Sequence, residues 1–147
     1  MELRNNEIVY DTTLLRIKSL MLSPLRIKAF SGNIYIRRLI LSFGDPICCP
    51  AVTFCLHNVT QPIFSNHFTS CEDWEAWEKL SRLNGRFVYV PKRLMCHRIH
   101  EESTTTAIIN DNKRSDENLE MYLKFWPKPI AKFINNFYAK AEDSNQL

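Results

Sequence analysis

Residues suited to acid–base chemistry gather in two places of this 147-residue sequence. The first is the acidic pair Glu72-Asp73, and the second is the later run Cys96-His97-Arg98-Ile99-His100. A carboxylate can take the proton of a hydroxyl group, imidazole can ligate a divalent ion, and guanidinium can stabilise a charged leaving group. Without further information, an acidic pair at a helix start is more often a capping acid beside a solvated one.

The acidic pair stands where the sequence predicts a helix to begin. Asp73 is suited to be the N-cap, because its carboxylate can accept from free backbone N–H groups at the positive end of the helix. Gly85 ends the helix as a residue free to take positive φ. Residues 87–90 then predict a strand closed by Pro91, ahead of a loop that carries the histidines. One helical face is apolar, with Trp74, Trp77, Leu80 and Leu83 at helical spacing.

This order of motifs resembles the second half of a family 2 glycosyltransferase of the GT-A type. In that family an acidic pair opens a helix, a strand follows, and an Arg-x-His loop comes next. The matching residues here are Glu72-Asp73 and Arg98-Ile99-His100, with Ser103 trailing, and the resemblance covers residues 35–125. It implies an α/β fold, present here as an α+β, partial GT-A-like domain: a few short strands, several helices and a C-terminal helix pair.

The resemblance also implies roles for single residues. Asp73 matches the general base that deprotonates the acceptor hydroxyl in inverting members, and Glu72 would flank the site or orient the acceptor. Trp74 would stack on a sugar ring, with a place in the core as the alternative. Arg98 and His100 would face the donor diphosphate. His100 would also ligate the divalent metal of the family, Mn or Mg, which this chain alone is not expected to bind tightly.

One half of the family pattern is missing from this sequence. In the family, a nucleotide-binding βαβ unit and an Asp-x-Asp motif precede the acidic pair, whereas this sequence contains no Asp-x-Asp. We therefore expect an acceptor-side part that is inactive, or nearly so, on its own: a truncation, a split gene product or an inactive remnant. An apolar edge would then be exposed, and either self-association or a partner chain would cover it.

Three functional hypotheses remain open at this stage. The first is a glycosyltransferase fragment whose complete enzyme uses a nucleotide-sugar donor and a saccharide acceptor, with surface polysaccharide as the expected product. The second is a non-catalytic module, derived from such a domain, that binds a glycan or a protein. The third is an unrelated metal-dependent hydrolase built on Asp73, His97 and His100.

Composition excludes several other classes. The net charge of +3 is small and the basic residues form no single run, so nucleic-acid binding is not expected. Because no apolar segment approaches the ~20 residues of a membrane span and no signal peptide is evident, we predict a cytoplasmic protein. Lys128, Lys132 and Lys140 on one amphipathic helix leave open a peripheral contact with the inner face of the membrane. The five cysteines predict reduced thiols, and the absence of Cys-x-x-Cys argues against zinc.

The chain is expected to form one domain. Its predicted parts are a helical or mixed connecting segment (1–30), an acceptor-side catalytic half (31–110), C-terminal helices (111–141) and a frayed tail (142–147). Within these parts, apolar periodicity predicts helices over 34–43 and 115–125 and an amphipathic helix through 130–138. Residues 51–56 are rich in β-formers and predict a strand.

Overall fold

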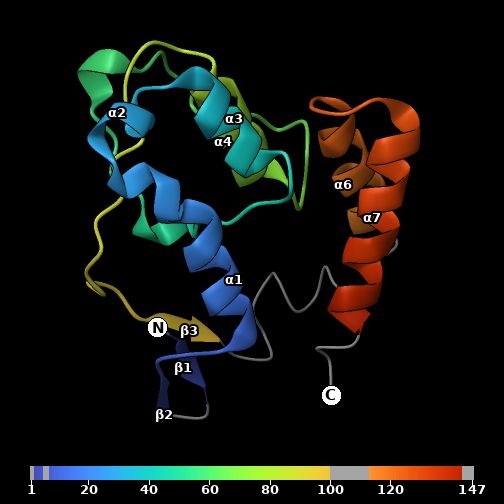
Figure 1. Cartoon of the computed structure of the whole chain (residues 1–147), viewed down its shortest axis with the longest axis horizontal. Helices are drawn as coiled ribbons and strands as arrows, with labels where there is room; N and C mark the ends of the chain where they lie inside the picture. Colours follow the sequence, from blue (N-terminus) through green and yellow to red (C-terminus); the bar gives the residue numbers. More distant parts are fainter. Residues whose placement is uncertain (1, 5–6, 100–112, 144–147) are drawn as a thin grey trace.

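Helices carry most of the fold, and the strands are short. The computed structural model in Figure 1 describes the backbone of residues 2–4, 7–99 and 113–143. Its helical elements are α1 (Thr13–Leu22), η1 (Ser23–Arg26), α2 (Lys28–Ser31), α3 (Ile34–Leu41), η2 (Cys49–Ala51), η3 (Leu56–Asn58), α4 (Glu72–Ser81), α6 (Lys113–Leu123) and α7 (Lys128–Asp143). The predicted mixture of several helices with a few short strands is confirmed.

Two of the N-terminal helices begin at polar capping side chains. The Thr12 hydroxyl accepts from the Leu15 amide at 3.2 Å at the start of α1, and the Asn33 side chain accepts from the Ile36 amide at 3.1 Å at the start of α3. Such caps satisfy backbone donors that have no partner within the helix. The helix predicted over 34–43 is therefore confirmed, with its end at Leu41.

The described strands form one small sheet at the N-terminus. Its order is β2 (Glu7–Val9), β1 (Glu2–Arg4), β3 (His97–Ile99). Leu3 of β1 lies opposite Ile8 in the antiparallel pair and opposite Arg98 in the parallel pair. The prediction that residues 97–99 belong to a loop is wrong, because the free edge of β1 offers them a hydrogen-bonding partner that is distant in sequence.

The core surrounds α4. Figure 1 shows α3 and α4 side by side, with α6 and α7 packed as a helix pair along one side of the molecule. This confirms the predicted C-terminal pair. The fully or almost fully buried apolar side chains of the core come from all four helices and from the segment that leads into α4: Leu41, Phe68, Cys71, Trp74, Ala76, Trp77, Met121, Tyr122 and Ala131.

Two indole groups close the end of α3. The Nε1 atom of Trp74 donates to the Leu41 carbonyl at 3.0 Å, and that of Trp126 donates to the Ser42 carbonyl at 2.8 Å. The last carbonyls of a helix have no partner inside it, so these two bonds satisfy groups that would otherwise be buried without one. They also join α3 to α4 and to the segment between α6 and α7.

Two carboxylates of α4 are buried and compensated by basic side chains. Glu78 pairs with Arg38 of α3 and with Arg82, one turn along its own helix. Glu75 pairs with Lys79 at 2.9 Å and with Lys124, at the end of α6, at 3.0 Å. Burial of Glu75 by itself would raise its pKa, but hydrogen bonds from Ser65, Lys79 and Lys124 lower the pKa to about 2. These pairs fix α4 against both neighbouring helices.

The N-terminal end of α4 is held by α6. Glu117 accepts from the backbone amides of Thr69, Ser70 and Cys71 at 3.0, 2.8 and 3.1 Å, and from the Ser70 hydroxyl. The N-cap position is Cys71, so the prediction of Asp73 as N-cap is wrong. Asp73 lies within the first turn instead, because a carboxylate from a different helix binds the free amides ahead of α4.

Two segments predicted as strands are extended but have no strand partner in the described chain. Residues 51–56 run from the last residue of η2 to the first residue of η3, and residues 87–90 carry no ladder hydrogen bonds. Both segments show alternating exposure, which is the period of a strand, with Val52, Phe54, Phe87 and Tyr89 turned inward. The exposure alternates as in a strand, but the assignment of strands was wrong, because a strand also requires a neighbour.

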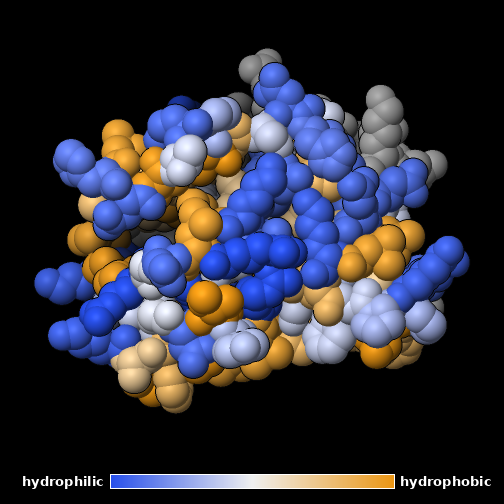
Figure 2. Space-filling model, turned by 90° about the horizontal axis from the view of Figure 1, so that it is seen from above, coloured by the Kyte–Doolittle hydropathy of each residue, from blue (hydrophilic) through white to orange (hydrophobic). Residues whose placement is uncertain are grey.

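Large apolar side chains remain exposed on several elements. Tyr35 is 84% exposed, and Leu20, Leu94 and Phe133 are more than 70% exposed. On the face in Figure 2, hydrophobic areas flank a broad hydrophilic band. This agrees with the expected apolar surface, while self-association stays a prediction. Within the described residues, every helix is too short or too polar to cross a lipid bilayer.

The carboxylate of Glu117 is expected to stabilise the protein in a pH-dependent way. Burial would raise its pKa, but the hydrogen bonds from Ser70, Thr69 and Cys71 outweigh burial and hold the pKa below its usual 4.5. The unfolded chain therefore takes up this proton first as pH falls, so the stabilisation is present above pH 4.5 and is lost at lower pH. Glu117→Gln should lower the free energy of unfolding by about 2 kcal/mol at pH 7, measured by urea denaturation.

The matched control is Glu120→Gln, an exposed glutamate on the same helix. It should change the stability by less than about 0.5 kcal/mol. The role of Glu117 would be contradicted if Glu117→Gln lost the same stability at pH 3 as at pH 7.

Candidate functional site

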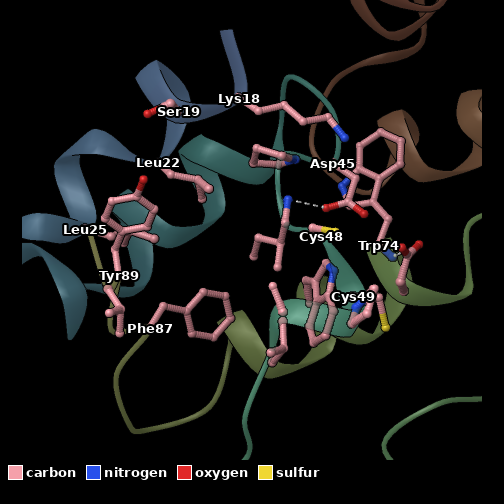
Figure 3. Close-up of a pocket in the computed structure, with 18 of the residues that line it drawn as sticks. Lys18, Ser19, Leu22, Leu25, Asp45, Cys48, Cys49, Trp74, Phe87 and Tyr89 are labelled. Atoms are coloured by element: carbon pink, nitrogen blue, oxygen red, sulfur yellow. Dashed lines mark hydrogen bonds between the residues drawn. The ribbon is translucent and has the colours of Figure 1, made fainter. Parts of the chain in front are cut away.

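A cavity of about 1420 Å³ opens between α1, the loop that follows α3, one face of α4 and the extended segment after Gly85. In Figure 3, Asp45, Cys48, Cys49 and Trp74 lie on one side of this cavity, and Leu25, Phe87 and Tyr89 lie on the other. The cavity thus has a polar side with carboxyl and thiol groups and a side of apolar and aromatic groups.

The polar side contains a pair of carboxyl groups, Asp45 and Asp73. Gly44 precedes Asp45 with a φ of 136°, a conformation that L-residues rarely adopt, and so turns the chain after α3. One Asp45 oxygen accepts from the Ile47 amide at 2.9 Å, and the carboxyl group also hydrogen-bonds to that of Asp73. Asp73 Oδ1 accepts from the Trp74 amide at 2.8 Å.

The pKa of the Asp45 carboxyl group is raised. Burial and the neighbouring charge of Asp73 raise the pKa of Asp45 to about 8. Asp45 therefore keeps its proton at pH 7, and it can donate that proton in the hydrogen bond to Asp73. The arrangement resembles other close carboxyl pairs, in which one member stays protonated because ionising both would place two negative charges next to each other.

Lys18 brings a positive charge to this side of the cavity. Figure 3 shows its side chain reaching from α1 toward Asp45. Its charge acts on Asp45 and on the Cys48 thiol, in each case lowering the pKa, but burial outweighs it. Burial also raises the pKa of Cys49, where the negative charge of Asp73 adds to the effect. Both thiols therefore stay protonated near pH 7, as expected for small apolar groups and not for nucleophiles.

The structure places only some of the predicted site residues together. Glu72 and Asp73 both line the cavity, Glu72 being exposed and Asp73 half-buried. Trp74 also lines it, but it is 3% exposed and packs on Tyr122 and Phe125, which favours the alternative of a core position.

The Arg-x-His motif is placed differently from the acidic pair. Arg98 is exposed in β3 and does not line the cavity, whereas His97 does. His100 lies outside the described residues, so its predicted contact with a diphosphate or metal stays a prediction.

The described residues do not offer a metal site. No group of three or more His, Cys, Asp or Glu side chains is arranged to hold a metal ion within the described parts of the chain. The nearest approach is the pair Asp45 and Asp73, but Asp45 is protonated at neutral pH and Lys18 adds a like charge to any cation there. A protonated Asp45 is a poor ligand for a divalent ion. The predicted ligand His100 lies outside the described residues, so the family's metal and the hydrolase hypothesis built on Asp73, His97 and His100 stay predictions.

Asp45 and Lys18 were missed by sequence reasoning. In the sequence, Gly44-Asp45-Pro46 indicates only a break after the helix predicted over 34–43, and Lys18 is one of several basic residues in the first quarter of the chain. The one available signal was an acidic residue at a forced turn directly after an apolar helix. Nothing in the sequence indicated that Asp45 meets Asp73.

Comparisons with known proteins identify no relative of this chain. No protein-family model matches the chain, and no significant match exists among curated proteins or solved structures.

The protonation of Asp45 leads to a pH-dependent prediction for stability. The folded protein keeps the Asp45 proton up to a pKa of about 8, whereas the unfolded chain loses it near 3.8, so stability falls as pH rises between these values. Asp45→Asn retains an acceptor for the Ile47 amide and cannot ionise. It should match the wild type near pH 4 and exceed its free energy of unfolding by about 1–3 kcal/mol at pH 9.

Urea denaturation at several pH values measures this difference, with Asp116→Asn, an exposed aspartate on α6, as control. The control should show the same small effect at pH 5 and pH 9. An Asp45→Asn variant whose stability followed the wild-type curve across this range would contradict the assignment.

Proposed function

We propose that this chain supplies the acceptor-binding and general-base part of an inverting glycosyl transfer from a nucleotide sugar. One observation carries the proposal: Asp73, the residue that the family resemblance marks as base, lies at a large cavity in hydrogen-bond contact with the carboxyl group of Asp45. The resemblance supplies the reaction, and the geometry supports the role of Asp73.

The carboxyl pair suits the removal of a hydroxyl proton. A base in the cavity must be ionised and must reach the hydroxyl group. Asp45 keeps its own proton, so Asp73 is the member of the pair that accepts the proton of the saccharide hydroxyl. The hydroxyl oxygen then forms the bond to the anomeric carbon of the donor, and the bond to the nucleoside diphosphate breaks with its electron pair leaving on the phosphate oxygen.

Asp45 is the positioning residue in this proposal. Its oxygen is fixed by the Ile47 amide, so the hydrogen bond that it gives to Asp73 has a defined direction. That bond holds the Asp73 carboxylate toward the cavity. Lys18, close to the pair, offsets part of the negative charge that would otherwise repel an oxygen nucleophile as it loses its proton.

The opposite side of the cavity suits a sugar ring. Aromatic residues contribute there, including Phe87 and Tyr89, and apolar ring faces of sugars pack on such groups. Tyr89 is itself fixed by the guanidinium of Arg26, 5.2 Å from its ring centre. A saccharide between the aromatic and carboxyl sides would present a hydroxyl group toward Asp73.

The test compares Asp73→Asn with the wild type in transfer and in binding. Transfer is measured as release of UDP or GDP from a panel of nucleotide sugars in the presence of saccharide acceptors, with a nucleotide-binding half supplied separately, because the chain alone is expected to be inactive or nearly so. Asp73→Asn should lower kcat about 10²- to 10⁴-fold, because asparagine cannot take the proton, while acceptor affinity measured by calorimetry stays within about threefold.

Asp116→Asn is the matched control, since it makes the same substitution at an exposed aspartate of α6 that does not line the cavity. It should change kcat by less than about tenfold. Transfer by Asp73→Asn at the wild-type rate would refute the role of Asp73 as the general base. A folded wild-type chain that bound saccharide, but showed no transfer and no dependence on Asp73, would favour the non-catalytic binding module.

A further inference from the structure

Arg37 is a buried cation on the wall of the cavity. It belongs to α3, is only 2% exposed, and lines the same cavity as Asp73. Its Nη2 donates to the Leu83 carbonyl at 2.8 Å, and its guanidinium lies 5.2 Å from the ring centre of Phe87. These two contacts fix the position of the guanidinium beside the aromatic side of the cavity.

The charge of Arg37 has no counter-charge among the described residues. The next residue, Arg38, shows the contrast: it forms an ion pair with the buried Glu78. Arg37 forms no ion pair within the described chain, and its buried Nε has no hydrogen-bond partner there. Burial without a compensating charge lowers its pKa. A buried guanidinium is costly unless an anion or an acceptor completes its bonds.

Trp77 provides a second buried donor at the same cavity. It is 2% exposed and lines the cavity, and its Nε1 also has no hydrogen-bond partner among the described residues. Its ring is held in place by stacking on Phe54, with 5.8 Å between the ring centres. Two rigid donor groups without acceptors therefore line one cavity, which is the arrangement expected where a ligand supplies oxygen atoms.

The separation between Arg37 and the carboxyl pair can be estimated from the length of α4. Asp73, Trp77 and Leu83 all line the cavity, and the Leu83 carbonyl accepts from Arg37. At 1.5 Å per residue, the eight steps from Asp73 to the end of α4 at Ser81 span about 12 Å, and Leu83 follows in the turn after the helix. In Figure 3, Phe87, the residue next to the Arg37 guanidinium, lies across the cavity from Asp45.

We propose that Arg37, with the indole N–H of Trp77, forms an anion-binding subsite for a phosphate or carboxylate group of the cavity's ligand. Guanidinium is suited to both groups, because its N–H donors match the spacing of two oxygens. Arg37 offers a donor and an unbalanced charge, and Phe87 fixes the plane of the guanidinium.

The subsite deepens the proposed function and, for the identity of the acceptor, rests on it. With the reacting hydroxyl at Asp73, an anionic group held by Arg37 beside the Leu83 carbonyl lies past the other end of α4, about 12 Å along the helix and farther than one sugar ring reaches. The acceptor is then an anionic saccharide longer than one unit, its charge coming from a uronic acid or from a phosphate at its far end. Neutral short saccharides fill only the part of the cavity near Asp73.

The first test observes the Arg37 side chain directly in the wild-type chain. Nitrogen–proton spectra record the Nε–H resonance of Arg37, assigned by its absence in Arg37→Lys, during titration with sodium phosphate, with sodium acetate, and with sodium chloride at equal ionic strength. The resonance should shift in a saturable way with phosphate, acetate or both, and should not do so with chloride. A response to phosphate alone indicates a phosphate-bearing acceptor, and a response to acetate alone indicates a uronic acid.

The second test uses paired variants. Arg37→Met should weaken binding of the responsive anion by about tenfold or more, whereas Arg86→Met, which removes an exposed arginine of the same cavity, should change it by less than about twofold. Asp73→Asn should leave the anion response intact, so that a failure of the general-base role is read separately from a failure of the subsite.

Two results would overturn the proposal. One is an Arg37 Nε resonance that stays fixed while phosphate and acetate are added, which would leave Arg37 with the structural role of holding Leu83. The other is Arg37→Met that binds the anion as tightly as the wild type. Where Arg37→Met fails to fold, the wild-type titration decides alone.

Discussion

The bonds between Glu117 and the chain just before α4 determine where the rest of the structure is placed. The Glu117 carboxylate accepts hydrogen bonds from three backbone amides before α4, and these bonds fix the direction in which α4 leaves the preceding loop. The position of Asp73 within the first turn follows from it. Glu75 and Glu78 then attach the same helix to α6 and α3. One helix is thus fixed at its start and along its length, and the cavity lies against its remaining face.

Ionisable side chains away from solvent fall into three cases in this protein. Glu75 and Glu78 form ion pairs with basic side chains, Asp45 keeps its proton and is neutral, and Arg37 has no counter-charge within the described chain. The first case builds the scaffold, since an ion pair satisfied on all sides has no further chemistry to offer. Within the described parts of the chain, the other two cases are found at the cavity. The two ionisable side chains without an ion pair, Asp45 and Arg37, therefore both lie where a ligand can enter.

The sequence predicted what depends on neighbouring residues and missed what depends on distant ones. Apolar periodicity located α3, α4, α6 and α7, because a helical face is encoded within a few turns. Residues 51–56 and 87–90 are rich in β-formers and extended, but a strand needs a partner that local composition does not reveal. Asp73 was predicted as the N-cap of α4 because local sequence does not show that Glu117, which is distant in sequence, accepts from the amides just before the helix. For the same reason Asp45, the partner of Asp73, was not predicted.

The two indoles that close the end of α3 make the assembly of the protein visible to spectroscopy. The sequence holds three tryptophans. Trp74 and Trp126 bond to successive carbonyls of one helix end from opposite neighbours, while Trp77 faces the cavity. Emission from the first two depends on whether the C-terminal helix pair is docked, and emission from the third depends on what fills the cavity. Intrinsic fluorescence thus records folding and ligand entry through different residues of the same unlabelled chain.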